Sequence, residues 1–280
     1  SEVGKATTTG ARNTIIGYQA ALSATTNTDN TIIGYQAFKT ANAGEGQNVV
    51  IGRSAGAGID NGSTDNNVII GQEAGYGGGG ALIGCVVIGR DAMKSTSAQS
   101  QTGTIAIGKE ALYSLTSGEG NTALGYQALY TTGHQEKNTA VGYEALKVAS
   151  GSAGTGNNTA VGYQAGTAVT TATGLTLIGS SAGAAITTGV RNTLVGSGAG
   201  DALVAVNDNV AVGHNALGGS TAAEYCVSFG TYAMDCTVTA AANGTVGIGN
   251  HSLSALTSGA GNVAIGYEAG KAVTTGGNNT

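Results

Sequence analysis

One short motif recurs, with small variations, along the whole chain. Its clearest copies are residues 121–129 (NTALGYQAL), 138–146 (NTAVGYEAL) and 158–166 (NTAVGYQAG). Each copy contains a central glycine, and successive central glycines lie 17 to 20 residues apart. A fixed period of this kind is typical of a solenoid, in which every repeat forms one coil that stacks on its neighbours. The central glycines are Gly17, Gly34, Gly52, Gly71, Gly89, Gly108, Gly125, Gly142, Gly162, Gly179, Gly196, Gly213, Gly230, Gly249 and Gly266.

The residues before each central glycine predict one short strand per coil. The residue three positions before the glycine is Thr, Val or Ile in every copy, and the residue directly before it is aliphatic everywhere except at Phe229. β-Branched residues at alternate positions are typical of a strand, whereas a chain this rich in Gly and β-branched residues does not favour helices. We therefore predict an all-β, parallel β-solenoid of about fifteen coils, which occupies residues 1–280 as a single repeat array.

The residue between these two strand positions is also apolar in many copies, for example Ile32, Val50 and Leu194. A strand that is apolar on both faces is expected to be covered on both faces. One face can pack inside its own coil. The other face needs a second cover, which is either another chain or the other half of the same coil. The first possibility predicts that the protein associates with copies of itself.

Asparagine stands four positions before the central glycine in most copies. In stacked coils, residues at one position form a column that runs along the solenoid, and asparagines in such a column can hydrogen-bond to one another as a ladder. We expect this structural ladder at Asn13, Asn30, Asn48, Asn67, Asn121, Asn138 and Asn158.

A second column directly follows the central glycine and contains several tyrosines. Charged residues such as Arg53 and Lys109 take the same position in other copies, so this column must reach solvent. The column is open to two interpretations, which are packing between half-exposed aromatic rings and a strip on which a ligand stacks. The candidate surface-contact residues are Tyr18, Tyr35, Tyr126, Tyr143, Tyr163 and Tyr267.

The second half of each coil contains one apolar slot that is filled in two ways. Where the fourth residue after the central glycine is Gly, as at Gly183 and Gly200, an aliphatic residue follows three positions later. Where that fourth residue is large, as at Phe38 and Leu146, the later position is small. This alternation predicts one core cavity that is filled from either of two backbone positions. Two copies depart from it and fill both positions, with Leu112 and Leu115 in one and Leu253 and Leu256 in the other.

Composition excludes several classes of function. The chain has 50 Gly, no Pro, no Trp and only 10% charged residues, which is unlike an ordinary globular enzyme. The net charge is −5 and no basic stripe is present, so nucleic acid is not an expected partner. No apolar run approaches the roughly 18 residues of a transmembrane helix, so membrane insertion is not expected either.

No set of residues predicts catalysis or a cofactor. His134, His214 and His251 lie in different coils, without a nucleophile or a carboxylate at a meaningful spacing. The polar segment 59–67 (IDNGSTDNN) matches neither the EF-hand pattern nor the repeat of calcium-binding β-rolls. We therefore expect a non-enzymatic protein with no cofactor and no metal site.

The three cysteines fall into two groups. Cys85 and Cys226 occupy the same column eight coils apart, which is far beyond the reach of a disulfide. Cys226 and Cys236 belong to one coil and form a candidate disulfide. Cys85 is then left over and is expected to be a small buried hydrophobic residue.

The repeats at residues 262–266 (NVAIG) and 209–213 (NVAVG), followed by Ala269 and Ala216, resemble those of a known family. They resemble the head repeats of YadA-like trimeric autotransporter adhesins and the similar N-T-A-x-G-Y-x-A-L arrays in tail fibres of tailed bacteriophages. The resemblance covers essentially the whole chain. It implies a left-handed parallel β-roll in which three chains pack around a central axis. The adhesin repeats differ in three ways: they place Asn one residue earlier, favour Ser where Ala stands here and have a shorter period. No coiled-coil stalk or membrane anchor is seen here either. These differences favour a phage-fibre-like or other extracellular filament.

The resemblance implies a structural or adhesive segment of an extracellular fibre, on a virion or a cell surface. Such a segment would form a homotrimer, give mechanical reach and attach to a host-surface receptor or glycan. Because residues 2–14 align without a gap on residues 268–280, we also expect the chain to be a segment of a longer repetitive fibre protein. The same match favours an alternative, in which copies polymerise end to end into a filament. A glycan- or ice-binding solenoid is the third hypothesis.

Overall fold

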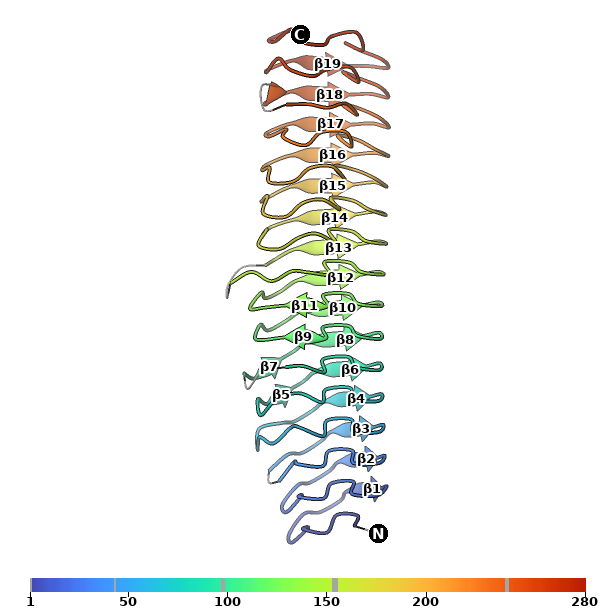
Figure 1. The fold of residues 1–280 in the computed structure, drawn as a ribbon, viewed down its shortest axis with the longest axis vertical. Coiled ribbons are helices and arrows are strands. Elements are labelled where there is room, and N and C mark those ends of the chain that lie inside the picture. Colours follow the sequence, from blue (N-terminus) through green and yellow to red (C-terminus); the bar gives the residue numbers. More distant parts are fainter. Residues whose placement is uncertain (1, 43, 97–98, 153–155, 240–241) are drawn as a thin grey trace. The chain divides into compact units, whose positions relative to one another are not determined.

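The computed structural model describes residues 2–42, 44–96, 99–152, 156–239 and 242–280. The chain forms two compact units, of which unit 1 is Ser1–Asn138 with Ser150–Gly154 and unit 2 is Thr139–Ala149 with Thr155–Thr280. Each unit is a parallel β-solenoid, and the described residues contain no α-helix (Figure 1). The two units together make about 14 turns. The predicted all-β solenoid is therefore confirmed.

Unit 1 contains one three-residue strand in each coil. Neighbouring strands pair in parallel and without offset, so that Thr14 lies opposite Thr31 and Ile15 opposite Ile32. These strands are β1 (Thr14–Ile16), β2 (Thr31–Ile33), β3 (Val49–Ile51), β4 (Val68–Ile70), β6 (Val86–Ile88), β8 (Ile105–Ile107) and β10 (Thr122–Leu124).

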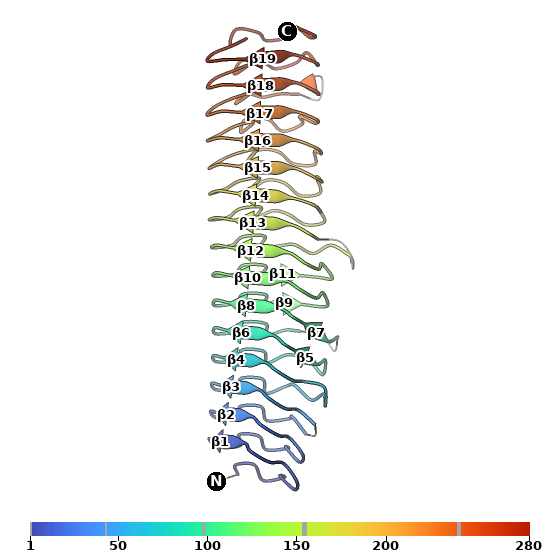
Figure 2. The same ribbon diagram turned by 180° about the vertical axis from the view of Figure 1, so that it is seen from behind.

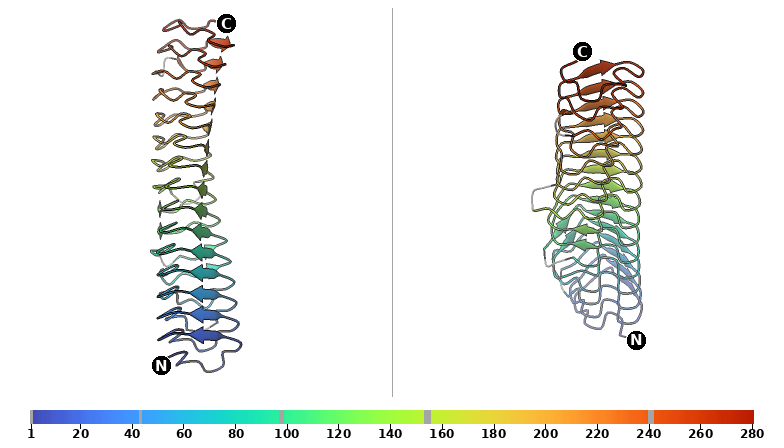
Figure 3. Two further views of the ribbon diagram at one scale, coloured as in Figure 1. Left: turned by 90° about the vertical axis from the view of Figure 1, so that its right-hand side faces the viewer. Right: turned by 45° about the horizontal axis from the view of Figure 1, so that its top comes forward.

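Unit 1 also has two small additional sheets. They consist of β5 (Leu82–Ile83) paired with β7 (Gln101–Thr102), and of β9 (Ser114–Leu115) paired with β11 (Thr131–Thr132). The pair β9 and β11 lies on the opposite side of the coil from the main strands (Figure 3).

Unit 2 repeats the same arrangement, with the strands again paired in parallel and without offset. Seen from behind, the segments that join successive strands complete each coil (Figure 2). The strands are β12 (Thr139–Val141), β13 (Thr159–Val161), β14 (Thr176–Ile178), β15 (Thr193–Val195), β16 (Val210–Val212), β17 (Val227–Phe229), β18 (Val246–Ile248) and β19 (Val263–Ile265).

The core of each coil is narrow. The middle residue of nearly every strand points inward and is fully buried, for example Val50, Ile69 and Leu194. An alanine three residues after the central glycine, for example Ala55 or Ala199, is also buried and packs at the corner of the coil. Because side chains alternate along a strand, the first and third residues of each strand point outward.

The central glycines are required by the close approach of successive coils. Gly71 has a φ of +136°, a conformation that residues with a Cβ rarely adopt. A Cβ added there would lie 2.6 Å from the carbonyl oxygen of Gly89 in the next coil. The same contact recurs along each unit, which explains why this position is invariant among the copies.

Candidate functional site

The outward face of the stacked strands, which we call the apolar face, carries at least one apolar side chain in every strand of each unit. In unit 1 the third strand residue is Ile in six strands and Leu in the seventh, and in unit 2 it is Val, Ile or Phe. The first strand residue is Thr, Val or Ile in every case. No charged side chain lies on this apolar face. Its most exposed members are Ile16, Leu124, Ile178, Val210, Phe229, Val263 and Ile265.

The apolar face is not covered by the chain's own coils. The middle strand residues are buried, whereas most of the outward residues are partly exposed and Phe229, for example, remains 53% exposed. A contiguous exposed apolar surface that runs over many strands is typical of an interaction site. Of the two covers that the sequence left open for this face, the other half of the same coil is therefore excluded.

The tyrosine column forms stacked pairs along the solenoid. In unit 1 the ring centroids of Tyr18 and Tyr35 lie 5.7 Å apart, with 19° between the ring planes. In unit 2 the corresponding values for Tyr143 and Tyr163 are 5.3 Å and 13°. All four rings are roughly half exposed. Because neighbouring rings stack face to face, they present their edges to solvent, which favours the packing interpretation over a strip for ligand stacking.

Tyr126 and Tyr267 complete this column. The Lys109 ammonium lies 5.2 Å from the centroid of the Tyr126 ring, which is a cation–π contact. Tyr267, by contrast, is 75% exposed. A further stacked pair, Tyr113 and Tyr130, lies outside the predicted column, with ring centroids 5.0 Å apart. The sequence interpretation missed this pair, although both tyrosines stand five residues after a central glycine.

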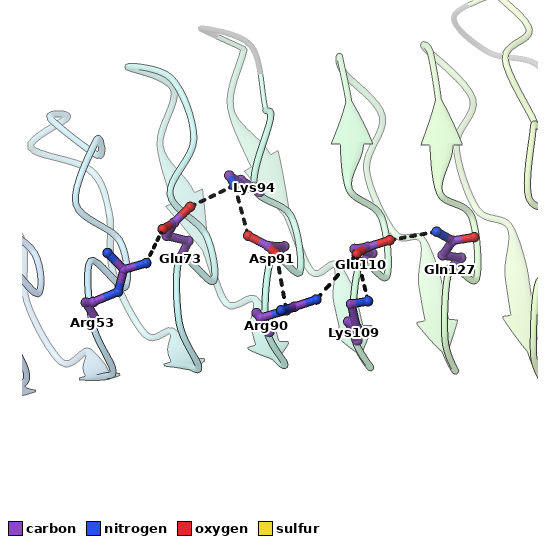
Figure 4. A network of polar contacts seen from close by, with 8 residues as sticks. All are labelled: Arg53, Glu73, Arg90, Asp91, Lys94, Lys109, Glu110 and Gln127. Atoms are coloured by element: carbon purple, nitrogen blue, oxygen red, sulfur yellow. Dashed lines mark hydrogen bonds and ion pairs between the residues drawn. The ribbon is translucent and has the colours of Figure 1, made fainter.

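A network of charged side chains links successive coils of unit 1 (Figure 4). Lys94 Nζ lies 2.7 Å from Glu73 and 3.0 Å from Asp91. Arg53 pairs with Glu73 at 2.8 Å. The hydrogen bond from Lys94 is the main reason why the pKa of the Glu73 carboxyl lies below its usual value. The ion pair between Lys94 and Glu73 therefore favours the charged form of both side chains.

The network continues along the next coils. Gln127 donates a hydrogen bond of 2.6 Å to Glu110, which lowers the pKa of that carboxyl, and Lys109 lies 3.2 Å from the same carboxyl. Arg90 lies 3.4 Å from Asp91. Most of these groups are partly exposed, so each pair contributes little alone, and the network acts by linking several coils. Its four cations (Arg53, Arg90, Lys94 and Lys109) and three carboxylates (Glu73, Asp91 and Glu110) leave a net charge of only +1, so it is not a strongly basic surface.

The predicted asparagine column is a hydrogen-bonded ladder. Asn30 Oδ1 accepts from both the backbone nitrogen and the side-chain nitrogen of Asn48, at 3.0 and 3.1 Å. Asn48 Oδ1 accepts in the same way from Asn67. The side-chain nitrogen of Asn48 also donates to the carbonyl of Thr64 at 2.8 Å. Each buried amide thus satisfies backbone groups of the next coil, which would otherwise be costly to bury.

The other predicted ladder residues make the same kinds of contact. Asn13 Oδ1 accepts from Asn30, and Asn121 Oδ1 accepts from Asn138. Asn158 Oδ1 accepts from the backbone nitrogen of Leu175, which replaces asparagine in its coil.

The candidate disulfide between Cys226 and Cys236 is absent, since all three cysteines are free. Cys226 replaces asparagine in the ladder, and its Sγ lies 3.7 Å from the carbonyl of Ala242 in the next coil. Cys236 Sγ instead lies 2.8 Å from the carbonyl of Leu256. The two thiols are thus directed at different backbone groups. Burial and the nearby Asp235 raise the pKa of Cys236 to about 12, which makes it a poor nucleophile at neutral pH.

The ladder is interrupted at Thr245, whose buried hydroxyl has no hydrogen-bond partner. We expect Thr245→Asn to stabilise the protein by about 1 kcal/mol, because the new amide can donate to the carbonyl of Gly259 as Asn262 donates to that of Gly276. Denaturant-induced unfolding measures this gain. Thr245→Val, which removes the hydroxyl without adding an amide, is the control and should give a smaller gain. Equal stability of the two variants would show that the ladder does not extend to this position.

The histidines do not form a catalytic set. Ser117 Oγ and His134 Nδ1 lie 2.6 Å apart on the exposed surface, but no carboxylate orients the imidazole in the described part of the chain. His214 and His251 lie on either side of the Tyr232 ring. Among the described residues, no group of three His, Cys, Asp or Glu side chains could hold a metal ion. The described residues also contain no helix that is long and apolar enough to span a membrane.

No protein-family model, curated protein or solved structure matches this chain. The candidate functional features therefore come from the structure alone. They are the apolar face, the stacked tyrosines and the ladders that join the coils.

Proposed function

We propose that this chain is a non-enzymatic, structural or adhesive segment of an extracellular fibre, in which copies associate through their apolar faces. The observation that carries the proposal is the uncovered apolar face, which bears no charge on any strand of either unit. Such a face is costly in water and is a hazard for aggregation unless a partner covers it. A second copy of the chain offers a face of the same chemistry and the same spacing between strands.

Three copies are the proposed assembly. The resemblance of the NVAIG and NTAVGYQAG repeats to trimeric adhesin and phage-fibre repeats supports this number. In a cyclic trimer with parallel chains, all three apolar faces point to one axis and are removed from water together. The tyrosine column and the variable turns then remain available for contact with a host receptor or glycan. The ladders between coils suit a segment whose task is mechanical reach.

The assembly is tested by solution mass, measured with light scattering. We expect a mass three times that of the 27.1 kDa chain. Ile70→Glu together with Ile88→Glu should give monomers, because both residues lie on the apolar face and would place buried charges at the interface. Ser63→Glu together with Thr188→Glu adds the same charge to exposed turns and should leave the trimer intact. A wild-type mass of 27.1 kDa would refute the association.

Polymerisation end to end is the second candidate, because strands of neighbouring copies can pair in the same parallel register, without offset, as the strands within each unit. Negative-stain images separate the two candidates, since trimers appear as discrete particles and end-to-end polymers as long filaments. A glycan array in turn tests whether the surface binds sugars.

A further inference from the structure

Two polar side chains in the interior of unit 1 lack conventional partners. Glu45 and Asn27 both stand seven residues before a central glycine, in successive coils. Their side chains are buried, at 0% and 2% exposure. Neither carboxyl oxygen of Glu45 and neither amide atom of Asn27 has a hydrogen-bond partner of good geometry. Four unpaired polar atoms at one place in a narrow core require a physical explanation.

A charged carboxylate does not suit this site. A buried ion without a partner of opposite charge is far more costly than a neutral polar group. No cation pairs with Glu45 in the described part of the chain. Burial accordingly raises the pKa of Glu45 above the ordinary value of 4.5, and the negative charge of Asp60 acts in the same direction. Contacts with the backbone of Glu45 itself, with the Asn27 amide and with the backbone of Asn42, none of good hydrogen-bond geometry, lower that pKa, but burial raises it by more.

A neutral carboxylic acid, in contrast, matches a primary amide. The acid O–H donates to the amide oxygen, while the acid carbonyl accepts from the amide N–H. This pairing uses both polar atoms of Asn27 and both oxygens of Glu45, which are the four atoms that otherwise lack partners. It requires one proton on Glu45.

We propose that Glu45 is protonated in the folded protein and forms an acid–amide pair with Asn27 that locks two neighbouring coils together. The pair is thus a pH-sensitive lock within unit 1. Loss of the proton leaves a buried carboxylate that can accept from Asn27 only once, and the Asn27 oxygen is left without a donor. The coils around residues 27–45 then become easier to open.

The direction of the pH dependence follows from proton linkage. The folded state binds the Glu45 proton more tightly than the unfolded state does. The stabilisation is therefore fully present below the unfolded-state pKa and is lost as the pH rises towards the folded-state pKa. Within that interval, linkage predicts that the folding equilibrium constant falls by about tenfold for each pH unit. The lock favours the closed coils in mildly acidic surroundings.

Unfolding measured across a series of pH values tests the lock. Glu45→Gln replaces the acid by an amide that stays neutral at every pH, so its stability should depend on pH less than that of the wild type. It should also exceed the wild type in stability at the alkaline end. Glu119→Gln, at an exposed position, is the matched control and should keep the wild-type dependence. A Glu45→Gln profile parallel to that of the wild type would overturn the proposal.

A spectroscopic measurement on the wild-type chain decides the question even if the variant fails to fold. Infrared spectra of protein labelled with ¹³C at glutamate carboxyls should show a protonated-carboxyl band at a pH above 4.5, where exposed glutamates are ionised. The band should persist in Glu119→Gln and disappear as the pH is raised further. Its absence at every such pH would show that Glu45 is charged in the folded protein.

Discussion

Gly71→Ala is expected to disrupt the coils around it and to destabilise unit 1 by about 4 kcal/mol or more. Two costs combine in this variant. The φ of +136° is strained for any residue with a side chain, and the new methyl group would lie 2.6 Å from the Gly89 carbonyl oxygen. That oxygen belongs to the backbone of the next coil, which cannot move without breaking the strand pairing between β4 and β6.

The chain offers a matched control for this substitution. Gly79 lies in an exposed turn and is not in the left-handed conformation. No atom lies within 4 Å of a Cβ added at this position. Gly79→Ala should therefore be nearly neutral. Denaturant-induced unfolding measures both variants, and hydrogen exchange resolved by peptide should place the damage of Gly71→Ala in the coils on either side of it. A loss spread evenly over the chain would contradict the local clash.

The sequence predicted the features that repeat in every copy. Strands were predictable because β-branched residues alternate before each central glycine. The asparagine ladder was predictable because a side chain that recurs at one position of a stacked coil lies beside its own copy. Both inferences need only the period and the known spacing of strands. They do not depend on which way a particular side chain turns.

The sequence did not predict features that depend on pairs of unlike residues in different coils. The link from Lys94 to Glu73 joins residues at different positions of neighbouring repeats, and no column contains both. The pairing of Glu45 with Asn27 occurs once and leaves no periodic signal. The Tyr18 and Tyr35 rings stand in a visible column, but only the side-chain torsion angles decide whether they stack or point outward.

The core slot was understood in part from the sequence. The alternation between the fourth and the seventh residue after the central glycine is consistent with the structure, since Leu146 and Leu203 are both fully buried. The structure adds a third contributor, the middle residue of the strand. A Cβ on Gly200 would lie 2.7 Å from Leu203 Cδ1 and 2.9 Å from Leu194 Cδ1. In this coil the cavity is therefore shared among three positions, and Leu194 explains the glycine six positions later.

This sharing predicts a rescue in unit 2. Leu194→Ala alone leaves a cavity in the core and should cost about 2–5 kcal/mol. Gly200→Leu alone forces a side chain into the space that Leu194 and Leu203 occupy, which should cost about 1–3 kcal/mol or more. The combination of Leu194→Ala, Gly200→Leu and Leu203→Ala should be more stable than Leu194→Ala alone, because the new leucine fills the vacated volume.

The chain itself contains the precedent for this combination. One coil of unit 2 has Ala140 in the strand, Leu146 four residues after the glycine and Ala149 three residues later, and all three are fully buried. Leu146 adopts a φ of +47°, close to the +55° of Gly200, so a leucine is compatible with that backbone. Unfolding of the single and triple variants measures the coupling between these positions. If the losses of unfolding free energy were additive, the three side chains would fill separate spaces. The contacts at Gly200 indicate instead that they share one cavity.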